Sequence, residues 1–377
     1  MRAAIVHYWL LNMRGGERVV EALCKLLPDA DVFTLFYEPE AVSPVIRSRR
    51  VTTSFLNPLR RYYRQLLPLM PIALESLDLR GYDLVISSES GPAKGVLTGS
   101  NTRHVCYCHS PMRYLWDLYP AYLHDWTPSF WKKMAIAAFS SRLRVWDHAT
   151  ASRVDEFAAN SVNVQRRIWR AYRRRSEVIH PPVPVDTFRW REPEDYYLLV
   201  SELVAYKRVA DAVRCFSRTG RRLKIVGRGP EYRRLKRMAQ PNVEFCGRVG
   251  AGELRDLYAR CRALVMPGEE DFGMVAVEAM ASGKPVIALG RGGVLEAVPP
   301  ERSAGILYEE PGEEWLEGAV RVFERSEPSV NRLELQAWAT RFSESRFQVR
   351  MRELLGLGVA ESSQPYVVPR TGTGAGA

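Results

Sequence analysis

Two carboxylates stand at a fixed spacing in an acidic, glycine-containing segment between Met266 and Ala288. Glu270 lies in this segment, and Glu278 follows eight positions later. The pattern predicts a strand that ends at Met266, then a loop, then a helix that begins near Met274 and carries Glu278 in its second turn. Carboxylates accept paired hydrogen bonds from vicinal hydroxyls, so the two acids could hold a sugar and a ribose in one cleft. A solvated acidic loop would explain the same spacing.

Paired glycines indicate a second kind of chemistry, phosphate binding. Gly15 and Gly16 open a segment of helical pattern, where a phosphate could approach free backbone N–H groups and the positive end of the helix dipole. A tight turn between strand and helix is the alternative. Gly227 and Gly229 also follow a strand pattern, but Tyr232 stands where a dinucleotide-binding fingerprint needs its third glycine. A tight turn with a proline at the helix start explains that pair better.

The elements that must position these residues are short apolar strands separated by helical periods, which indicates βα units and parallel sheets. The strands expected in the first half are Ala3–Val6, Asp31–Phe36, Leu84–Ser87, His104–Cys108 and Ala158–Ser161. Those expected in the second half are Tyr196–Val200, Leu223–Val226, Val243–Phe245, Ala263–Met266, Pro285–Ala288 and Ile306–Tyr308. The sequence therefore predicts an α/β protein with two Rossmann-like, doubly wound parallel-sheet domains and a ligand cleft between them, beyond the carboxyl ends of the strands.

The domains are expected to join at His180–Pro184, where three prolines in four residues exclude a helix and favour an extended connector. The first domain would cover residues 1–184 and the second residues 185–339. Glu334–Leu355 has a helical pattern, and its part from about residue 340 to 356 is expected to pack back on the first domain. Residues 359–377 end in small and polar residues and are predicted to be disordered.

Composition excludes several classes of protein. With 377 residues, 46% of them hydrophobic and 26% charged, the chain has the balance of a folded protein. No run reaches the roughly 20 apolar residues of a membrane span, and the start lacks the apolar core of a signal peptide, so we expect a cytoplasmic protein. Six scattered cysteines favour reduced thiols and no metal site. The net charge of +11 favours an anionic partner: nucleic acid, anionic lipid or a phosphorylated small molecule.

Basic residues concentrate in two segments. Arg47–Leu74 holds six arginines and no acid, interleaved with aromatic and leucine side chains, and Pro58, Pro68 and Pro71 divide it into short pieces. This mixture favours peripheral contact with an anionic membrane surface. Arg166–Arg175 holds six more arginines, which indicate either a solvated helix face or contact with phosphate or anionic headgroups.

Several segments together resemble the retaining family 4 glycosyltransferases, which have the two-domain GT-B fold. The stretch from Glu270 to Glu278 is similar to the Glu-x7-Glu signature of that family. The other segments that agree, in chain order, are Gly15-Gly16-Glu17, His109–Asp117, Ala159–Ser161, Val178–Val183, Ala205–Arg208 and Gly292–Glu296. The likeness covers roughly residues 1 to 355. It is greatest to the branch that contains O-antigen and exopolysaccharide mannosyltransferases.

The resemblance implies roles in binding a nucleotide-sugar donor. Glu270 would bind hydroxyls of the transferred sugar, Glu278 would bind the ribose, and Lys207 would neutralise the diphosphate. The other donor-binding positions that it implies are Gly15, Gly16, Arg208, Phe272 and Gly273. These roles agree with the physics of the reaction, because a leaving diphosphate needs positive charge and N–H donors where its negative charge develops.

One position departs from the family pattern. Many relatives carry an arginine five residues before the lysine, whereas this chain has Glu202 there. The pair of cations is then incomplete unless Arg208 or Arg228 substitutes. A sugar-nucleotide-binding protein that has lost catalysis would also explain Glu202, although the retained Glu270 and Lys207 argue against it.

Residues His109–Asp117 supply the remaining candidates. The resemblance places His109 beside the donor sugar and makes it a candidate catalytic residue together with Glu270 and Lys207. Arg113 and Trp116 could line the acceptor site or could simply pack. Glu89 also follows a strand end, where an acid that stabilises a helix dipole is the commoner explanation.

These features predict a metal-independent retaining glycosyltransferase. It would move a hexose, most simply mannose from GDP-mannose, to a polyprenyl-diphosphate-linked glycan at the inner face of the plasma membrane, during surface polysaccharide assembly. Front-face attack is implied, with the leaving phosphate accepting the proton of the acceptor hydroxyl. A UDP-sugar fits the same residues. A nucleic-acid-binding protein would fit the charge, but Glu269, Glu270, Asp271 and Glu278 at the expected cleft would repel a duplex.

Overall fold

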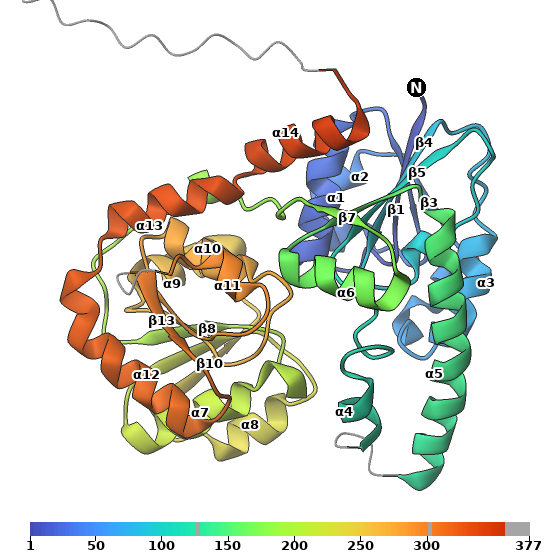
Figure 1. The fold of residues 1–377 in the computed structure, drawn as a ribbon. Helices are drawn as coiled ribbons and strands as arrows, with labels where there is room; N and C mark the ends of the chain where they lie inside the picture. The colour runs from blue at the N-terminus through green and yellow to red at the C-terminus, as the bar shows by residue number, and fades with distance from the viewer. Residues whose placement is uncertain (125–128, 301–303, 359–377) are drawn as a thin grey trace, which may run out of the picture.

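The computed structural model describes residues 1–124, 129–300 and 304–358. Two parallel sheets form two domains, each with helices packed on both faces of its sheet (Figure 1). The predicted pair of doubly wound parallel-sheet domains is therefore confirmed.

The first sheet has seven strands in the order β3-β2-β1-β4-β5-β6-β7. Their bounds are β1 (Ala3–His7), β2 (Asp31–Thr34), β3 (Val51–Thr53), β4 (Leu84–Glu89), β5 (Arg103–Cys108), β6 (Glu156–Ala159) and β7 (Ser176–Val178). The strand order reverses between β1 and β4, where His7 lies beside Ser88. The loops after β1, β4 and β5 consequently share one edge of the sheet, which is the usual place for a ligand in such a fold.

The second sheet has six strands in the order β10-β9-β8-β11-β12-β13. Their bounds are β8 (Tyr197–Val200), β9 (Leu223–Val226), β10 (Val243–Gly247), β11 (Leu264–Met266), β12 (Val286–Leu289) and β13 (Gly305–Tyr308). Here the order reverses between β8 and β11, so the loop that carries Lys207 and the loop that carries Glu270 follow neighbouring strands.

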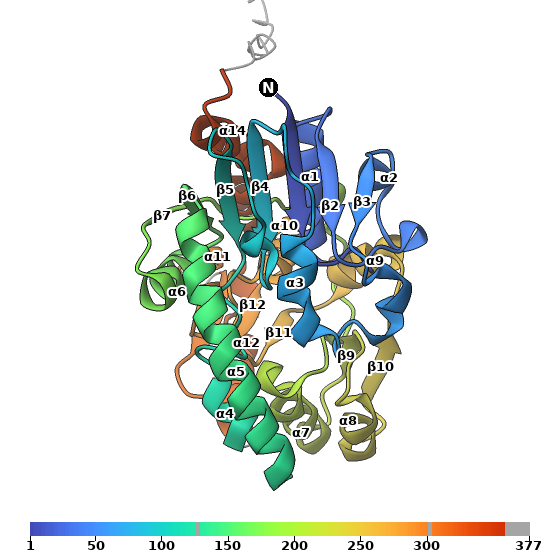
Figure 2. The same ribbon diagram turned by 90° about the vertical axis from the view of Figure 1, so that its right-hand side faces the viewer.

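Helices connect the strands and cover both faces of each sheet (Figures 1 and 2). Those of the first domain are α1 (Gly15–Leu26), α2 (Pro44–Arg47), α3 (Met70–Glu75), α4 (Tyr119–His124), α5 (Phe130–Thr150) and α6 (Val162–Tyr172). Those of the second are α7 (Val209–Thr219), α8 (Tyr232–Met238), α9 (Ala251–Arg260), α10 (Met274–Ala281), α11 (Val294–Ala297) and α12 (Glu313–Ser326). In both views α4 and the start of α5 extend beyond the first sheet, toward the side of the second domain.

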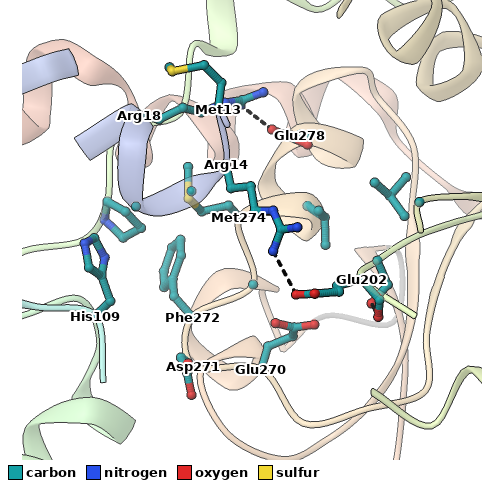
Figure 3. A pocket seen from close by; sticks show the side chains of 18 of the residues that line it. Met13, Arg14, Arg18, His109, Glu202, Glu270, Asp271, Phe272, Met274 and Glu278 are labelled. Carbon is teal, nitrogen blue, oxygen red and sulfur yellow. Dashed lines mark hydrogen bonds and ion pairs between the residues drawn. The ribbon is translucent and has the colours of Figure 1, made fainter. Parts of the chain in front are cut away.

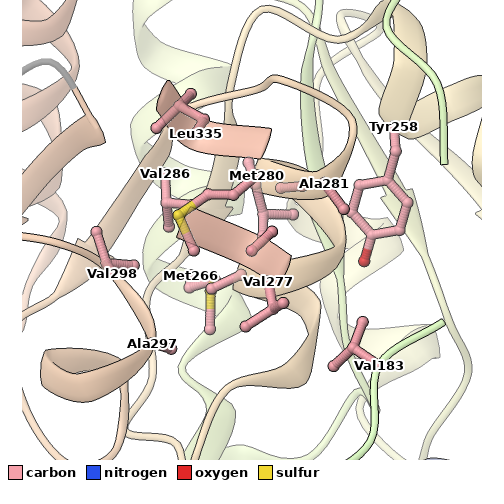
Figure 4. Close-up of a cluster of buried hydrophobic side chains, with 14 of the residues drawn as sticks. Val183, Tyr258, Met266, Val277, Met280, Ala281, Val286, Ala297, Val298 and Leu335 are labelled. Carbon is pink, nitrogen blue, oxygen red and sulfur yellow. The ribbon is translucent and has the colours of Figure 1, made fainter. Parts of the chain in front are cut away.

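Helix α10 lies inside the core of the second domain. Figure 4 shows Val277, Met280 and Ala281 of this helix among buried side chains of β11, β12 and α9, with Val183 of the connector in the same cluster. Helix α10 is buried on nearly all sides, and Glu278 is a carboxylate among its apolar residues. A carboxylate in such a place needs hydrogen-bond or ionic partners.

The helical pattern predicted over Glu334–Leu355 forms two helices, α13 (Arg332–Ala339) and α14 (Glu344–Leu355). The break comes at Ser343, whose hydroxyl caps α14 by accepting from the backbone N–H of Arg346 at 3.4 Å. The expectation of one continuous helix is therefore wrong. Helix α14 packs against α1, and its apolar residues Phe347, Met351 and Leu355 belong to the core around β1. The tail predicted to be disordered lies outside the described residues.

Candidate active site

A cavity of about 470 Å³ lies between the two domains, where the carboxyl ends of the two sheets face each other (Figure 3). The first domain contributes Tyr8, Met13, Arg14, Gly15, Gly16, Arg18, Ser90, His109 and Asn160 to its lining. The second domain contributes among others Glu202, Lys207, Arg228, Arg248, Glu270, Asp271, Phe272, Gly273 and Glu278. Of the donor-site residues predicted from the sequence, all but Arg208 line this cavity.

The start of α1 and the start of α10 face each other across the cavity. A Cβ on Gly15 would lie 3.0 Å from the Sδ atom of Met274, the first residue of α10. A Cβ on Gly16 would lie 3.3 Å from the ring of His7. The paired glycines therefore allow a close approach that larger residues would obstruct. Both helices direct the positive ends of their dipoles toward the same space, which favours an anionic ligand.

Glu278 is held by one residue from each domain. Its side chain is only 6% exposed and accepts a hydrogen bond from Arg18 Nη1 of α1 at 2.5 Å (Figure 3). Its other oxygen accepts from the hydroxyl of Tyr258 at 2.8 Å. A carboxylate offers about four lone-pair sites, so Glu278 can still accept bonds from two ligand hydroxyls.

Glu270 forms an ion pair with Lys207 in the second domain. Burial alone would lower the pKa of Lys207, but Glu270 and neighbouring acids raise it above its usual value, so Lys207 is charged. Two glycines, Gly292 and Gly293, fix the loop that carries Glu270. Both belong to the segment Gly292–Glu296, one of those that resemble the family. The backbone N–H of Gly293 donates to the carbonyl of Glu270 at 2.8 Å, and a Cβ on Gly292 would lie 2.3 Å from that oxygen.

Gly227 and Gly229 have a structural role in the loop after β9. A Cβ on Gly227 would lie 1.8 Å from the carbonyl oxygen of Ser201, and one on Gly229 would lie 2.3 Å from that of Leu203. The two glycines therefore let this loop pack directly on the loop that follows β8. That close packing agrees with the sequence prediction, which favoured a tight turn at these glycines over a dinucleotide-binding site.

His109 lines the cavity from the end of β5. Its Nε2 lies 2.9 Å from the hydroxyl of Ser88, and burial lowers the pKa of His109 to about 4. The imidazole is consequently neutral near pH 7. A neutral imidazole can donate to or accept from a sugar hydroxyl without carrying charge.

Arg113 and Arg167 of the first domain hold the acidic loop beside Glu270. Arg167 pairs with both Glu269 and Asp271, and Arg113 Nη1 lies 3.3 Å from Asp271. Burial would raise the pKa of Asp271, but Arg113, Arg167 and Lys207 together lower it. Arg113 itself does not line the cavity. In the part of the chain that the structure describes, its side chain contacts the loop that carries the sugar-binding candidates.

Trp116 lies away from the cavity. Its indole N–H donates to Asp147 at 2.7 Å. Asp147 belongs to a fully buried cluster in which Lys94 pairs with both Asp147 and Glu89. Glu89 is fully buried in this cluster and also accepts from the backbone N–H of Lys94 at 2.6 Å, in the first turn of the 3-10 helix Ala93–Gly95. The indole of Trp116 is thus bonded to the buried cluster of the first domain and does not line the cavity.

The position that departs from the family pattern is occupied by an interdomain ion pair. Glu202 accepts from Arg14 Nη1 at 2.9 Å (Figure 3). It also accepts from Arg64 at 3.4 Å, and both arginines belong to the first domain. Arg208 is turned away and pairs with Asp211 at 2.8 Å. Arg228 does line the cavity. Of the two substitutes considered from the sequence, only Arg228 can therefore reach a ligand there.

Sequence reasoning missed Arg14, Arg18 and Tyr258. Arg14 and Arg18 lie on either side of the paired glycines, which is the one sign in the sequence that they could be near a ligand. Nothing in the sequence pairs them with Glu202 and Glu278.

No helix within residues 1–124, 129–300 and 304–358 is long and apolar enough to cross a membrane. Across the same residues, no group of three potential metal ligands comes together.

Two family models match consecutive parts of the chain. The model of Glycosyltransferase Family 4 matches residues 13–187, and that of Glycosyl transferases group 1 matches residues 186–338. The chain belongs to family 4 of the glycosyltransferases. It is accordingly a transferase.

Curated relatives match this glycosyltransferase over short regions. An uncharacterized glycosyltransferase of Methanocaldococcus jannaschii is 29% identical over 149 residues, which are 38% of this chain and 42% of the relative. A GDP-mannose-dependent alpha-mannosyltransferase of Mycobacterium tuberculosis is 41% identical over 87 residues, 23% of each chain. The chain thus spans less than half the length of the curated relatives that it matches.

Solved structures match this glycosyltransferase over nearly its whole length. HepE of Anabaena, in complex with UDP and glucose, has a TM-score of 0.68 at 16% identity, covering 95% of this chain and 100% of HepE. Sucrose-phosphate synthase of Thermosynechococcus elongatus has a TM-score of 0.69 at 18% identity, covering 94% of this chain and 98% of its own. These likenesses confirm the GT-B fold.

Proposed function

We propose that the chain transfers a hexose, with retention at the anomeric carbon, from a nucleoside diphosphate sugar to a polyprenyl-diphosphate-linked glycan. The observation that carries this proposal is the interdomain cavity, in which two carboxylates are each held by a cation. Glu270 is held by Lys207 and Glu278 by Arg18.

In this proposal the donor extends from Glu278 to Glu270. Glu278 accepts hydrogen bonds from the ribose hydroxyls, and Glu270 accepts them from the transferred sugar. The diphosphate lies between them, where Lys207 and the N–H groups at the starts of α1 and α10 offset the negative charge that develops on the leaving group. Front-face attack needs no protein nucleophile, and the leaving phosphate accepts the proton of the attacking hydroxyl. Neutral His109 orients a sugar hydroxyl.

GDP-mannose is the donor that we propose. Two of them, from Mycobacterium tuberculosis and Mycolicibacterium smegmatis, are named as GDP-mannose-dependent alpha-mannosyltransferases. A UDP-sugar is the second candidate, because HepE has been solved with UDP-glucose. The reaction is the same for both donors.

The first test is the melting temperature of the pure chain with GDP, UDP, ADP and their hexose conjugates, with and without added Mg²⁺. A ligand that binds only the folded state raises the melting temperature, because it adds to the free energy of unfolding. At a ligand concentration of a hundred times its Kd, this addition is about 2.7 kcal/mol. We expect GDP and GDP-mannose to stabilise the chain without Mg²⁺. Selective stabilisation by UDP would change the donor, and no response to any nucleotide would contradict the proposed function.

We place the acceptor side at a cytoplasmic, anionic membrane surface. Within the predicted basic segment, Phe55 is 59% and Ile72 is 60% exposed, and the start of α5 adds exposed Phe130 and Trp131. Exposed apolar side chains beside arginines suit a membrane interface. The chain should therefore sediment with anionic but not with neutral vesicles at low salt. Phe55→Ser/Ile72→Ser should release it while its stabilisation by GDP persists; sedimentation equal to that of the wild type would refute this placement.

A further inference from the structure

Arg14 stands in the donor cavity although it belongs to the first domain. It immediately precedes α1, lines the cavity, and extends its guanidinium across to Glu202 of the second domain (Figure 3). Its neighbour Gly15 is the residue whose Cβ would touch Met274 at the start of α10. Arg14 is thus fixed between the two helix starts that face the cavity.

Glu202 is an acid where an anionic ligand is expected, which by itself would disfavour the ligand. Its carboxylate, 26% exposed, is neutralised by Arg14 at 2.9 Å, with Arg64 at 3.4 Å. A guanidinium has five N–H donors in a planar fork. Among the described residues, the Arg14 guanidinium donates to Glu202 through its Nη1 group only. The remaining donors can bind a phosphate.

We propose that Arg14 supplies the second cation for the donor diphosphate, facing its outer phosphate, and that Glu202 positions the Arg14 guanidinium. This inference rests on the proposed function. It means that the cation missing at position 202, five residues before Lys207, is supplied by Arg14 of the opposite domain, across the cavity.

The other cations of the cavity fit this role less well. Arg208 does not line the cavity and is paired with Asp211. Arg228 and Arg248 do line it, but they follow β9 and β10, which lie farther from the β8–β11 switch point that carries Lys207 and Glu270. Arg14 is held against the β8 loop itself.

The test measures the affinity of the full chain for the nucleoside diphosphate that stabilises it and for the matching monophosphate. Losing a charge-assisted hydrogen bond to a phosphate should weaken binding roughly 10- to 100-fold. We expect Arg14→Gln to show this loss for the diphosphate and a loss of less than about threefold for the monophosphate. The matched control Arg64→Gln, which removes the other partner of Glu202 from outside the cavity, should leave both affinities near those of the wild type.

A relocated arginine separates phosphate binding from a simple interdomain contact. Arg14→Gln/Glu202→Arg has no ion pair but restores a guanidinium to the cavity, and we expect it to regain about tenfold in diphosphate affinity over Arg14→Gln. Wild-type diphosphate affinity in Arg14→Gln would overturn the proposal. So would equal losses for diphosphate and monophosphate without recovery in the double variant. A wild-type chain that binds no nucleoside diphosphate would overturn the proposed function and this inference with it.

The positioning role of Glu202 has its own readout. Glu202→Ala removes a negative charge, so electrostatics alone would strengthen diphosphate binding and leave kcat unchanged. If Glu202 positions Arg14, kcat at saturating donor should instead fall about tenfold, because a misplaced group loses transition-state stabilisation. An unchanged or higher kcat would overturn this part of the proposal.

Discussion

Glu270 and Glu278 differ in what holds them, although both are carboxylates of one cavity. Glu278 is fixed by Arg18 and Tyr258, whereas the carboxylate of Glu270 pairs, among the residues that the structure describes, only with Lys207. We expect Glu278→Ala to weaken nucleotide binding roughly 10- to 100-fold, because hydrogen bonds to a charged group are lost. Glu270→Ala should abolish transfer but spare nucleotide affinity, since Lys207 remains. Calorimetry with GDP, paired with a transfer assay, checks both, and equal loss of GDP binding in the two variants would contradict the assigned roles.

His104 gives a prediction about pH away from the cavity. Burial lowers its pKa to about 4, while the unfolded residue titrates near 6.5. Between these values the unfolded chain binds more protons, so this residue makes the fold less stable as pH falls from 6.5 toward 4. From pH 7 to pH 5 the wild type should lose roughly 2 kcal/mol of unfolding free energy relative to His104→Gln. Denaturant unfolding at the two pH values measures this, and a pH-independent difference would contradict it.

The sequence pointed to Glu270, Glu278 and Lys207 because a resemblance can be read from spacing along the chain. It did not point to Arg14 and Arg18, whose partners lie 188 and 260 positions away. Those pairs depend on how the domains face each other, which local patterns do not encode. The sequence also did not point to the hydrogen bond that fixes Trp116, because its partner Asp147 lies 31 positions away.

At the scale of elements, the loop that carries Glu270 depends on Gly293. A Cβ there would lie 2.2 Å from the carbonyl oxygen of Asp271, so Gly293→Ala must displace this loop. We expect kcat/KM to fall roughly 10- to 100-fold, because a shift of about 1 Å misplaces the sugar-binding carboxylate. The control is Gly318→Ala in the middle of α12, where a Cβ would have no neighbour within 4 Å. That change should stabilise the chain by about 0.5–1 kcal/mol, and unchanged kinetics in Gly293→Ala would contradict the role of the loop.

Strands were predictable where the chain carries a short apolar run. Every expected strand exists within a few residues, because apolar runs such as Ala3–His7 are buried throughout. The strands β3 and β7 were missed. Each has three half-buried residues at an edge of the first sheet, so neither shows an apolar run. The division between α13 and α14 was missed because a capping serine looks like one more polar position of a helix.

At the scale of the molecule, the domains are joined through the start of α6. Two of its first N–H groups, those of Val162 and Asn163, donate to Glu296 of the second domain at 2.8 and 3.2 Å. The hydroxyl of Ser161 also donates to the carbonyl of Asp271 at 2.6 Å. Helix starts need such acceptors, and here a different domain supplies them.

Removing that acceptor should loosen the interdomain contact. Glu296→Ala should lower the melting temperature by about 2–4 °C, the effect of losing about 1 kcal/mol of capping energy, and should raise the radius of gyration in small-angle scattering. The control Glu310→Ala removes an exposed acid paired with Arg291, so it should change neither quantity measurably. A radius of gyration equal to that of the wild type in Glu296→Ala would contradict this role.

The packing of α14 on α1 bears on how the chain is made. The first domain leaves the ribosome before the second domain is made, because the chain grows from its N-terminus at roughly 5–20 residues per second. Yet Phe347, Met351 and Leu355, which complete the core around β1, are synthesised only after the whole second domain. Until then the nascent first domain presents an apolar strip on α1 that invites chaperones or neighbouring chains. Cells that make this protein quickly should therefore recover more of it when translation is slowed or holdase capacity is raised.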